Sequence, residues 1–293
     1  MGLADWFSTF CRRIQIMNTG VIATRFKTIT ECLNKDFWDT SSEIDHSLYV
    51  GSYGRNTAAA GLSDVDILFQ LPYSVWKEYD AYTENGQAAL LQEFRASITK
   101  TYSKTSIRPD GQGIRVPFTD GLTFEIIPAF LNKDTSYTFL SSLDGGSWRT
   151  ANPAPESAAI QARNDACNFN LVPLCRMMRG WRKIWEVPIS GLLIDTLAYE
   201  FFGNYQNRNK SYRYYDFMCR DFFEWMAAQN SEQEYWEAPG SLQRIYGKGA
   251  FQHKASRCQQ IAIEAIDHET ANPSREWSAK QKWREIFGAT FPD

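Results

Sequence analysis

Asp64 and Asp66 open an apolar segment that runs from Val65 to Leu71. Alternate residues of a β-strand share a face, so the two carboxylates point to one side while Val65 and Ile67 point to the other. Two carboxylates held this close repel each other unless a cation lies between them, and Mg²⁺ prefers ligands that are all oxygen. The segment therefore predicts a strand with one buried face and one metal-binding face.

A turn that suits phosphate precedes this strand by about a dozen residues. Gly51 allows the backbone to turn sharply and to approach a ligand closely. Ser52 adds a hydroxyl, and the exposed amides of such a turn bind anions. Arg55 and Thr57 follow before the strand begins, and we count Arg55 with the expected nucleotide-binding residues.

A third carboxylate is expected from a neighbouring strand. Glu125 is the only acid within the apolar segment 122–130, where an acid is costly to bury unless it binds something. Asp120 lies nearby, but Asp120–Gly121 is a typical hairpin turn between the segments 114–118 and 122–130. Asp64, Asp66 and Glu125 are therefore predicted to hold two Mg²⁺ or Mn²⁺ ions, which activate a hydroxyl and bind a triphosphate.

The rest of the chain predicts two lobes of an α+β protein. The segment 143–155 is rich in Gly, Ser, Asn and Pro and is expected to be a loop between them. A lobe with a mixed sheet and an N-terminal helix should span 1–155, and a helical lobe 156–293, with a ligand cleft between them. Apolar residues at helical spacing predict helices over 5–39, 75–100, 158–186, 190–203, 213–229, 254–268 and 276–287.

Composition excludes several classes of protein. The 293 residues include 31 Lys and Arg against 34 Asp and Glu, so no global positive field is present to bind a nucleic-acid polymer stably. The six cysteines form no CxxC pair and the three histidines lie far apart, which argues against a zinc ribbon. With neither a signal peptide nor an apolar run near 18 residues, we expect a cytoplasmic chain without membrane contact.

The segment GSYGRNTAAAGLSDVDILFQL, residues 51–71, resembles the active-site signature of the DNA polymerase beta-like nucleotidyltransferases. It is most similar to that of the bacterial CD-NTases, which carry the SMODS domain. FEIIPAF, residues 124–130, resembles the family's third-carboxylate strand, where Asp is more frequent than Glu. Residues 146–153 and 283–292 resemble the loop before the family's helical lobe and its C-terminal ending, so the resemblance covers nearly the whole chain.

This resemblance implies a bilobal enzyme that joins nucleoside triphosphates, namely ATP, UTP or GTP, into a cyclic oligonucleotide and releases pyrophosphate. A separate effector protein would read this second messenger in anti-phage defence. By position, Gly51 and Ser52 would hold the triphosphate. Asp64, Asp66 and Glu125 would hold the metal ions.

The resemblance also implies nucleotide contacts from the helical lobe. Arg179 stands where the family often has a Lys that reaches the phosphates, and Lys183 is the alternative. Ser190 resembles a serine that contacts phosphate at the start of the next helix, although it would also suit a helix cap. Asn168 matches an Asn of the uridine-accepting, CdnE-type branch, with Asn170 as a rival. An amide pairs with the edge of uracil, which favours a product such as cyclic UMP-AMP.

Two other functions are compatible with parts of the sequence. A nucleotidyltransferase that modifies a tRNA or a protein would need a strong basic face or an added RNA-binding domain, and the net charge of −3 and the absence of an extra module count against it. A nucleotide sensor that has lost catalysis would be expected to lose its carboxylates, and all three are present.

Overall fold

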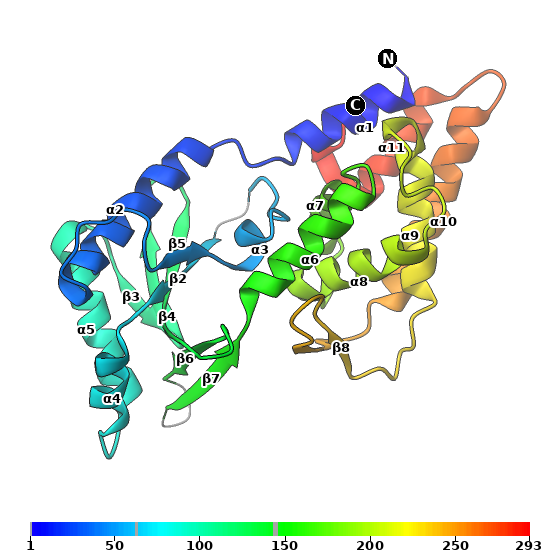
Figure 1. The fold of residues 1–293 in the computed structure, drawn as a ribbon. Coiled ribbons are helices and arrows are strands. Elements are labelled where there is room, and N and C mark those ends of the chain that lie inside the picture. Colours follow the sequence, from blue (N-terminus) through cyan, green and yellow to red (C-terminus); the bar gives the residue numbers. More distant parts are fainter. Residues whose placement is uncertain (1, 62–63, 143–145) are drawn as a thin grey trace. The chain divides into compact units, whose positions relative to one another are not determined.

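The computed structural model describes residues 2–61, 64–142 and 146–293, and the chain forms two compact units (Figure 1). The sheet unit comprises Met17–Gly54 and Leu62–Ala154. The helical unit comprises Met1–Ile16, Arg55–Gly61 and Pro155–Asp293. The expected ranges 1–155 and 156–293 differ from these units at two places, since the first 16 residues and the segment 55–61 belong to the helical unit.

The sheet unit contains one seven-stranded sheet. Strands β2 and β5 are parallel neighbours, and every other pair is antiparallel, which confirms the predicted mixed sheet. The order is β1-β2-β5-β4-β3, with β6 paired to β5 and β7 to β6. The strands are β1 (Ser47–Tyr49), β2 (Asp64–Gln70), β3 (Arg108–Asp110), β4 (Gly113–Pro117), β5 (Thr123–Leu131), β6 (Tyr137–Ser141) and β7 (Ser147–Ala151).

Helices α2 (Thr19–Phe37) and α5 (Gly86–Thr101) cover one face of this sheet. Phe69 of β2 lies 6.4 Å from Phe37 of α2 and 6.0 Å from Phe94 of α5, measured between ring centroids. Because Phe69 shares its face with Val65 and Ile67, the helices pack on the apolar side of β2. The carboxylates of the same strand consequently lie on the opposite face.

Three local features of the sheet unit differ from the sequence-based expectation. The helix expected over 75–100 is two helices, α4 (Tyr73–Asp80) and α5, because Asn85 adopts a left-handed φ of 60°. The loop expected over 143–155 contains strand β7, which pairs with β6, and helix α6 already begins at Pro153. Residues 143–145 of that loop lie outside the described residues. The helix α3 (Gly51–Gly54) is a single turn.

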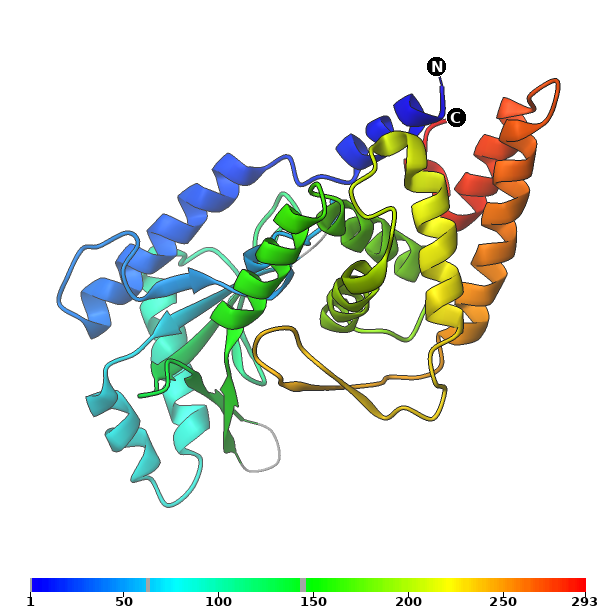
Figure 2. The ribbon, with the colours of Figure 1, turned by 45° about the vertical axis from the view of Figure 1, so that its right-hand side comes forward.

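The helical unit is built around one aromatic core. Its α-helices are α1 (Leu3–Arg13), α6 (Pro153–Ala166), α7 (Leu171–Ile184), α8 (Gly191–Asn204), α9 (Tyr215–Ala227), α10 (Gln252–Thr270) and α11 (Glu276–Phe287). Single 3-10 turns η1 (Tyr212–Tyr214) and η2 (Gly288–Thr290) and a hairpin of β8 (Tyr235–Glu237) and β9 (Arg244–Tyr246) complete it. In Figure 2, α10 and α11 lie side by side.

Helix α1 packs into this core although it is the first element of the chain. Phe7 lies 5.2 Å from Trp283, and Phe10 lies 4.9 Å from Phe287, between ring centroids. Both ends of the chain therefore belong to one core. No helix within the described ranges is long and apolar enough to cross a membrane.

Candidate active site

The predicted carboxylates form a row across two neighbouring strands. Asp66 of β2 stands directly opposite Glu125 of β5, and Asp64 stands opposite Thr123. Paired residues of neighbouring strands lie on one face of a sheet, so all three carboxylates share the face that α2 and α5 leave uncovered. Each carboxylate residue is half-buried, while Val65 between the two aspartates is buried. The alternation that the sequence predicted is present.

The Gly-Ser turn lies directly against this row. The Val50 amide donates to the Asp66 carbonyl oxygen at 2.9 Å, and Gly51 then starts α3 with a φ of 60°. A Cβ atom on Gly51 would lie 1.8 Å from Oδ2 of Asp66, which is an impossible distance. Glycine is therefore required here both by backbone conformation and by the approach of the carboxylate. The structure thus brings the backbone before Ser52 next to Asp66.

Polar neighbours set the charge of the row. The Gln112 Nε2 atom donates to Oε1 of Glu125 at 3.3 Å, and Nη2 of Arg115 lies 3.2 Å from Oδ1 of Asp64. Burial raises the pKa of Glu125 above its ordinary value, although the Gln112 hydrogen bond opposes the shift. The charge of Asp110 adds to this increase, and that of Arg115 counters it. A cation beside Glu125 would relieve the cost of its ionisation.

The donor set fits a hard divalent cation, because it offers carboxylate oxygens without nitrogen or sulfur ligands. Within the ranges that the structure describes, no three His, Cys, Asp or Glu side chains are already arranged to hold a metal ion. Asp66 and Glu125 are the closest pair in the sheet register, whereas Asp64 contacts Arg115. The carboxylate row therefore provides suitable metal ligands, but these are not arranged as a complete coordination site.

Two arginines that were expected at the nucleotide lie in a buried ion-pair network of the helical unit. Nε of Arg55 is 3.0 Å from Oδ2 of Asp195, and its Nη1 is 3.3 Å from Oε2 of Glu156. Arg179 contacts both oxygens of Asp195, at 2.6 and 2.9 Å. Thr57 donates its hydroxyl to Asp195 at 2.8 Å. The guanidinium groups of both arginines are therefore engaged with carboxylates.

Asp195 is the centre of this network and was not singled out in the sequence. Burial alone would raise its pKa, but Arg179 and Arg55 outweigh that effect and hold the pKa of Asp195 below its usual value. The signal in the sequence is an acid within the apolar run 192–198 of α8, which is the same kind of signal that identified Glu125.

The remaining helical-unit residues differ in their surroundings. Ser190 caps helix α8, since its hydroxyl oxygen accepts a hydrogen bond from the Leu193 amide at 3.1 Å. Lys183 is exposed near the end of α7. The structure thus shows a cap at Ser190 and a solvated helix face at Lys183.

The two candidate asparagines are separated by burial. Asn170 is buried, and its amide nitrogen donates to the carbonyl oxygens of Arg208 and Lys210, at 2.7 and 2.8 Å. Its amide oxygen accepts a hydrogen bond from the Tyr215 hydroxyl. Asn168 is exposed and donates to the Asn209 carbonyl oxygen at 3.2 Å. Asn168 is therefore the candidate with an accessible side chain.

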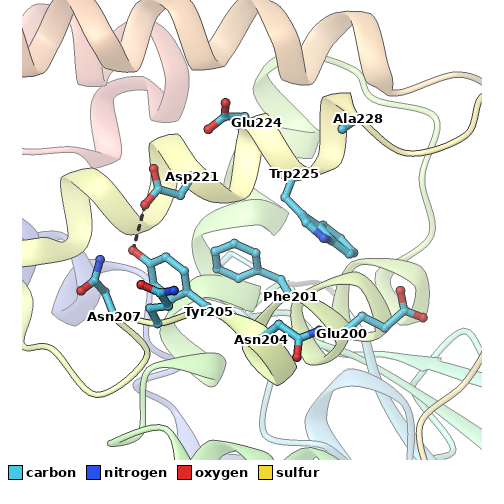
Figure 3. A pocket seen from close by; sticks show the side chains of 10 residues that line it. Glu200, Phe201, Asn204, Tyr205, Asn207, Asp221, Glu224, Trp225 and Ala228 are labelled. Carbon is cyan, nitrogen blue, oxygen red and sulfur yellow. Dashed lines mark hydrogen bonds between the residues drawn. The ribbon is translucent and has the colours of Figure 1, made fainter.

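A hollow of about 460 Å³ lies between α8 and α9 of the helical unit (Figure 3). Its walls include the aromatic rings of Phe201, Tyr205 and Trp225, and Tyr205 donates to Asp221 at 3.1 Å. Glu200 and Glu224 add two more carboxylates, and the ten lining residues include no Lys or Arg. This composition would repel a triphosphate, so the hollow does not suit the chemistry of the carboxylate row.

Residues 1–164 match the Second Messenger Oligonucleotide or Dinucleotide Synthetase domain, SMODS. The chain belongs to this family. It is therefore a bacterial CD-NTase, that is, a nucleotidyltransferase that makes oligonucleotides or dinucleotides, as the active-site signature predicted. The matched residues include the Gly-Ser turn and all three carboxylates of the SMODS chain.

Other proteins agree with this family and its fold. A probable cyclic nucleotide synthase of Bacillus cereus (strain VD146) is 26% identical, over 83% of the SMODS chain and 81% of that protein. CdnC of E. coli MS115-1, solved with ATP, is 17% identical with a TM-score of 0.69, and 98% of each chain is covered. CdnG of Bradyrhizobium diazoefficiens, solved with GTP, is 14% identical with a TM-score of 0.68, over 98% of the SMODS chain and 96% of CdnG. These structures confirm the predicted fold class.

Proposed function

We propose that the SMODS chain condenses nucleoside triphosphates into a cyclic oligonucleotide with the help of divalent metal ions. The observation that carries this proposal is the carboxylate row Asp64, Asp66 and Glu125 with the Gly51 backbone against Asp66. Its relatives support it, since one is a probable cyclic nucleotide synthase and two solved structures hold ATP and GTP. We infer that ATP, UTP or GTP are its substrates.

The roles of the site residues follow from their chemistry. Asp64, Asp66 and Glu125 would hold two Mg²⁺ or Mn²⁺ ions, which would polarise the phosphate and lower the pKa of the attacking hydroxyl. The Gly51–Ser52 turn would receive the triphosphate through its amides and the Ser52 hydroxyl. Its contact with Asp66 places this turn next to the carboxylates.

In the helical unit, we propose nucleotide contacts from Lys183, Ser190 and Asn168. Asn168 is exposed. Because its amide would suit the edge of uracil, we propose a uridine-containing product such as cyclic UMP-AMP. Arg55 and Arg179 are assigned a positioning role instead, because Asp195 already engages both guanidinium groups. Incubation with each pair of labelled triphosphates tests the base choice, and a product without uridine would contradict it.

The product would act on a separate effector protein in anti-phage defence, in the cytoplasm where nucleoside triphosphates are abundant. Neither a membrane nor a stably bound nucleic acid is needed for this role. Plating phage on cells with and without the wild-type gene and its genomic neighbours measures protection, which should be lost when the carboxylates are removed.

The double substitution Asp64→Ala and Asp66→Ala should abolish synthesis. The wild-type chain, incubated with four triphosphates and Mg²⁺ or Mn²⁺, should yield a phosphatase-resistant small product, and the double variant should yield none. Both aspartates are only half-buried, on the sheet face opposite α2 and α5, so thermal unfolding should change little. Retained synthesis in the double variant would refute the assigned site.

Asp120→Ala is the matched control for this experiment. Asp120 is an acid at the β4–β5 turn that pairs with Arg25 at 2.9 Å on the surface, so its removal should leave synthesis intact. If label instead enters tRNA or protein, the chain modifies a macromolecule and the cyclic product is excluded.

A further inference from the structure

The hollow between α8 and α9 has a wall of three aromatic rings that pack against one another (Figure 3). The ring centroids of Phe201 and Tyr205 are 4.5 Å apart, and those of Phe201 and Trp225 are 6.0 Å apart. Tyr205 and Trp225 are only half-buried, and both line the hollow. The face of an aromatic ring carries partial negative charge and attracts a cation. This wall therefore suits a ligand that is apolar along its length and positively charged.

Carboxylates accompany this aromatic wall. Glu200, Asp221 and Glu224 line the hollow, and its ten lining residues include no Lys, Arg or His. Asp221 is paired with Arg220 at 2.6 Å, whereas neither glutamate forms an ion pair within residues 2–61, 64–142 and 146–293. A concave surface of one charge sign concentrates ions of the opposite sign. The two glutamates thus give the hollow a negative charge that nothing on its walls neutralises.

A second hollow, of about 480 Å³, shares Glu200 with the first and runs along strand β8. Its lining has the same character, with two further carboxylates and two aromatic rings, namely Glu234, Glu237, Tyr235 and Trp236. The nearest cation of the hairpin is Arg244 of β9, which stands opposite Glu237 and lies 4.4 Å from the Tyr235 ring centroid. Because Glu200 lines both hollows, a linear ligand that contacts it can extend into each of them.

Glu200 is the carboxylate on which the two hollows meet, and it has no partner in the described part of the chain. Although its side chain is partly open to solvent, burial by the surrounding atoms raises the pKa of Glu200 above its ordinary value, and no cation opposes this shift. A cation placed beside Glu200 would favour its ionised form. The geometry of the hollows and the charge of their shared residue therefore call for the same kind of ligand.

We propose that these two hollows bind an aliphatic polyamine, a flexible chain of methylene groups that carries several ammonium groups. The methylene groups lie on the rings of Tyr205 and Trp225, and the ammonium groups meet Glu200 and Glu224. All the lining residues belong to the helical unit. The proposal goes beyond the synthesis of a cyclic oligonucleotide and does not depend on it.

A basic segment of a partner protein carries similar cations, but the walls favour the polyamine. Carboxylates offer only acceptor oxygens, and they are the charged groups of both hollows. A polyamine brings only donors, so each of its polar groups can be satisfied there. A peptide also brings one carbonyl oxygen per residue, which needs a donor when it is buried.

Spermidine is the probe that tests this site, in a calorimetric titration of the full chain at physiological ionic strength, where weak surface attraction is screened. Wild type should bind, and Glu200→Gln should weaken binding about tenfold, the loss expected for one charge-assisted contact. Glu276→Gln removes an exposed acid of α11 that lines neither hollow, so it should bind as wild type does.

Trp225 tests the aromatic wall separately from the charge. Trp225→Leu keeps an apolar side chain but removes the ring face, so it should weaken spermidine binding severalfold. Trp225→Phe restores a ring and should bind nearly as wild type does. Equal binding by the leucine variant and wild type would show that the ring takes no part and would contradict the assigned wall.

Absence of spermidine binding by wild type, or equal binding by wild type and Glu200→Gln, would overturn the polyamine site. The double variant Asp64→Ala and Asp66→Ala should bind spermidine normally, and a loss of binding there would place the polyamine at the carboxylate row instead. An oligolysine peptide is titrated in parallel. If the peptide binds through Glu200 and spermidine does not, the hollows dock a basic protein segment and the polyamine assignment is wrong.

Discussion

At the scale of single residues, Gly51 is the position where the smallest change should have the largest effect on chemistry. Its φ is 60°, and an added Cβ would meet Oδ2 of Asp66 at 1.8 Å. Gly51→Ala must therefore move Asp66, and a displacement near 1 Å can reduce the rate about 100-fold. Pyrophosphate release from four triphosphates should fall by that factor. Strain from the left-handed backbone should cost about 1–2 kcal/mol of unfolding free energy.

Gly121→Ala is the matched control, because it introduces backbone strain without displacing a carboxylate of the site. Gly121 has a φ of 88°, and an added Cβ would meet nothing within 4 Å. The Gly121→Ala variant should lose a similar amount of unfolding free energy and release pyrophosphate at the wild-type rate. Equal losses of activity in Gly51→Ala and Gly121→Ala would show that the contact with Asp66 is irrelevant.

The sequence predicts single residues well where the chemistry is local. The shared face of Asp64 and Asp66 follows from strand alternation, and Glu125 is conspicuous as a lone acid in an apolar segment. Arg55 could not be placed in this way, because its partner Asp195 lies 140 positions further along the chain. Nothing in a single sequence pairs residues over that distance.

At the scale of elements, helix α9 carries a carboxyl group that should make stability depend on pH. Asp216 is buried in its first turn, one side-chain oxygen has no hydrogen-bond partner, and burial raises the pKa of Asp216 to about 6. The folded state then binds the proton more tightly than the unfolded state. Wild type should therefore lose on the order of 3 kcal/mol of unfolding free energy as the pH rises from about 4 to above 6.

Asp216→Asn removes this ionisation. The variant should be more stable than wild type at pH 7 and nearly equal to it below pH 4, as measured by urea unfolding at both values. Glu224→Gln changes an exposed acid of the same helix and should show no such difference. A stability difference between Asp216→Asn and wild type that is the same at both pH values would contradict the assignment.

Element prediction succeeded for three C-terminal helices, but the helices expected over 5–39, 75–100 and 158–186 are each two helices, and the short strand β7 was missed. Helix α11 spans 276–287 as expected, and α8 and α10 differ from expectation by one or two residues at each end. Strand β7 has only five residues, mostly exposed, in a segment whose Gly, Ser and Asn content is typical of a loop. Its conformation comes from pairing with β6, a tertiary contact that composition does not reveal.

At the scale of the whole molecule, the chain alternates between its two units. The first helix contributes Phe7 and Phe10 to the aromatic core of the C-terminal helices, and the segment 55–61 also belongs to the helical unit. The sequence predicted two lobes divided at a single loop. That division could not place the first helix in the helical unit, because the contact between Phe7 and Trp283 joins opposite ends of the sequence. The segment 55–61 lies in the chain between Ser52 and Asp64, two residues of the candidate site.

Asp195→Asn should therefore affect both stability and chemistry. Removing the charge of Asp195 leaves Arg55 and Arg179 buried with less compensation, which typically costs about 3–5 kcal/mol. Because the segment 55–61 is covalently joined to the turn before it and the strand after it, its loosening should also misplace Ser52 relative to Asp64. Pyrophosphate release should fall even at temperatures where the variant remains folded by circular dichroism.

Asp165→Asn is the matched control, because Asp165 is an exposed acid of α6 whose partner is Gln161 of the same helix. It should retain both unfolding free energy and activity. If Asp195→Asn is destabilised but releases pyrophosphate at the wild-type rate while folded, the network only supports the helical unit. If the rate falls while the fold persists, the segment 55–61 links that network to the carboxylates, and an ion pair in one unit governs the geometry of a site in the other.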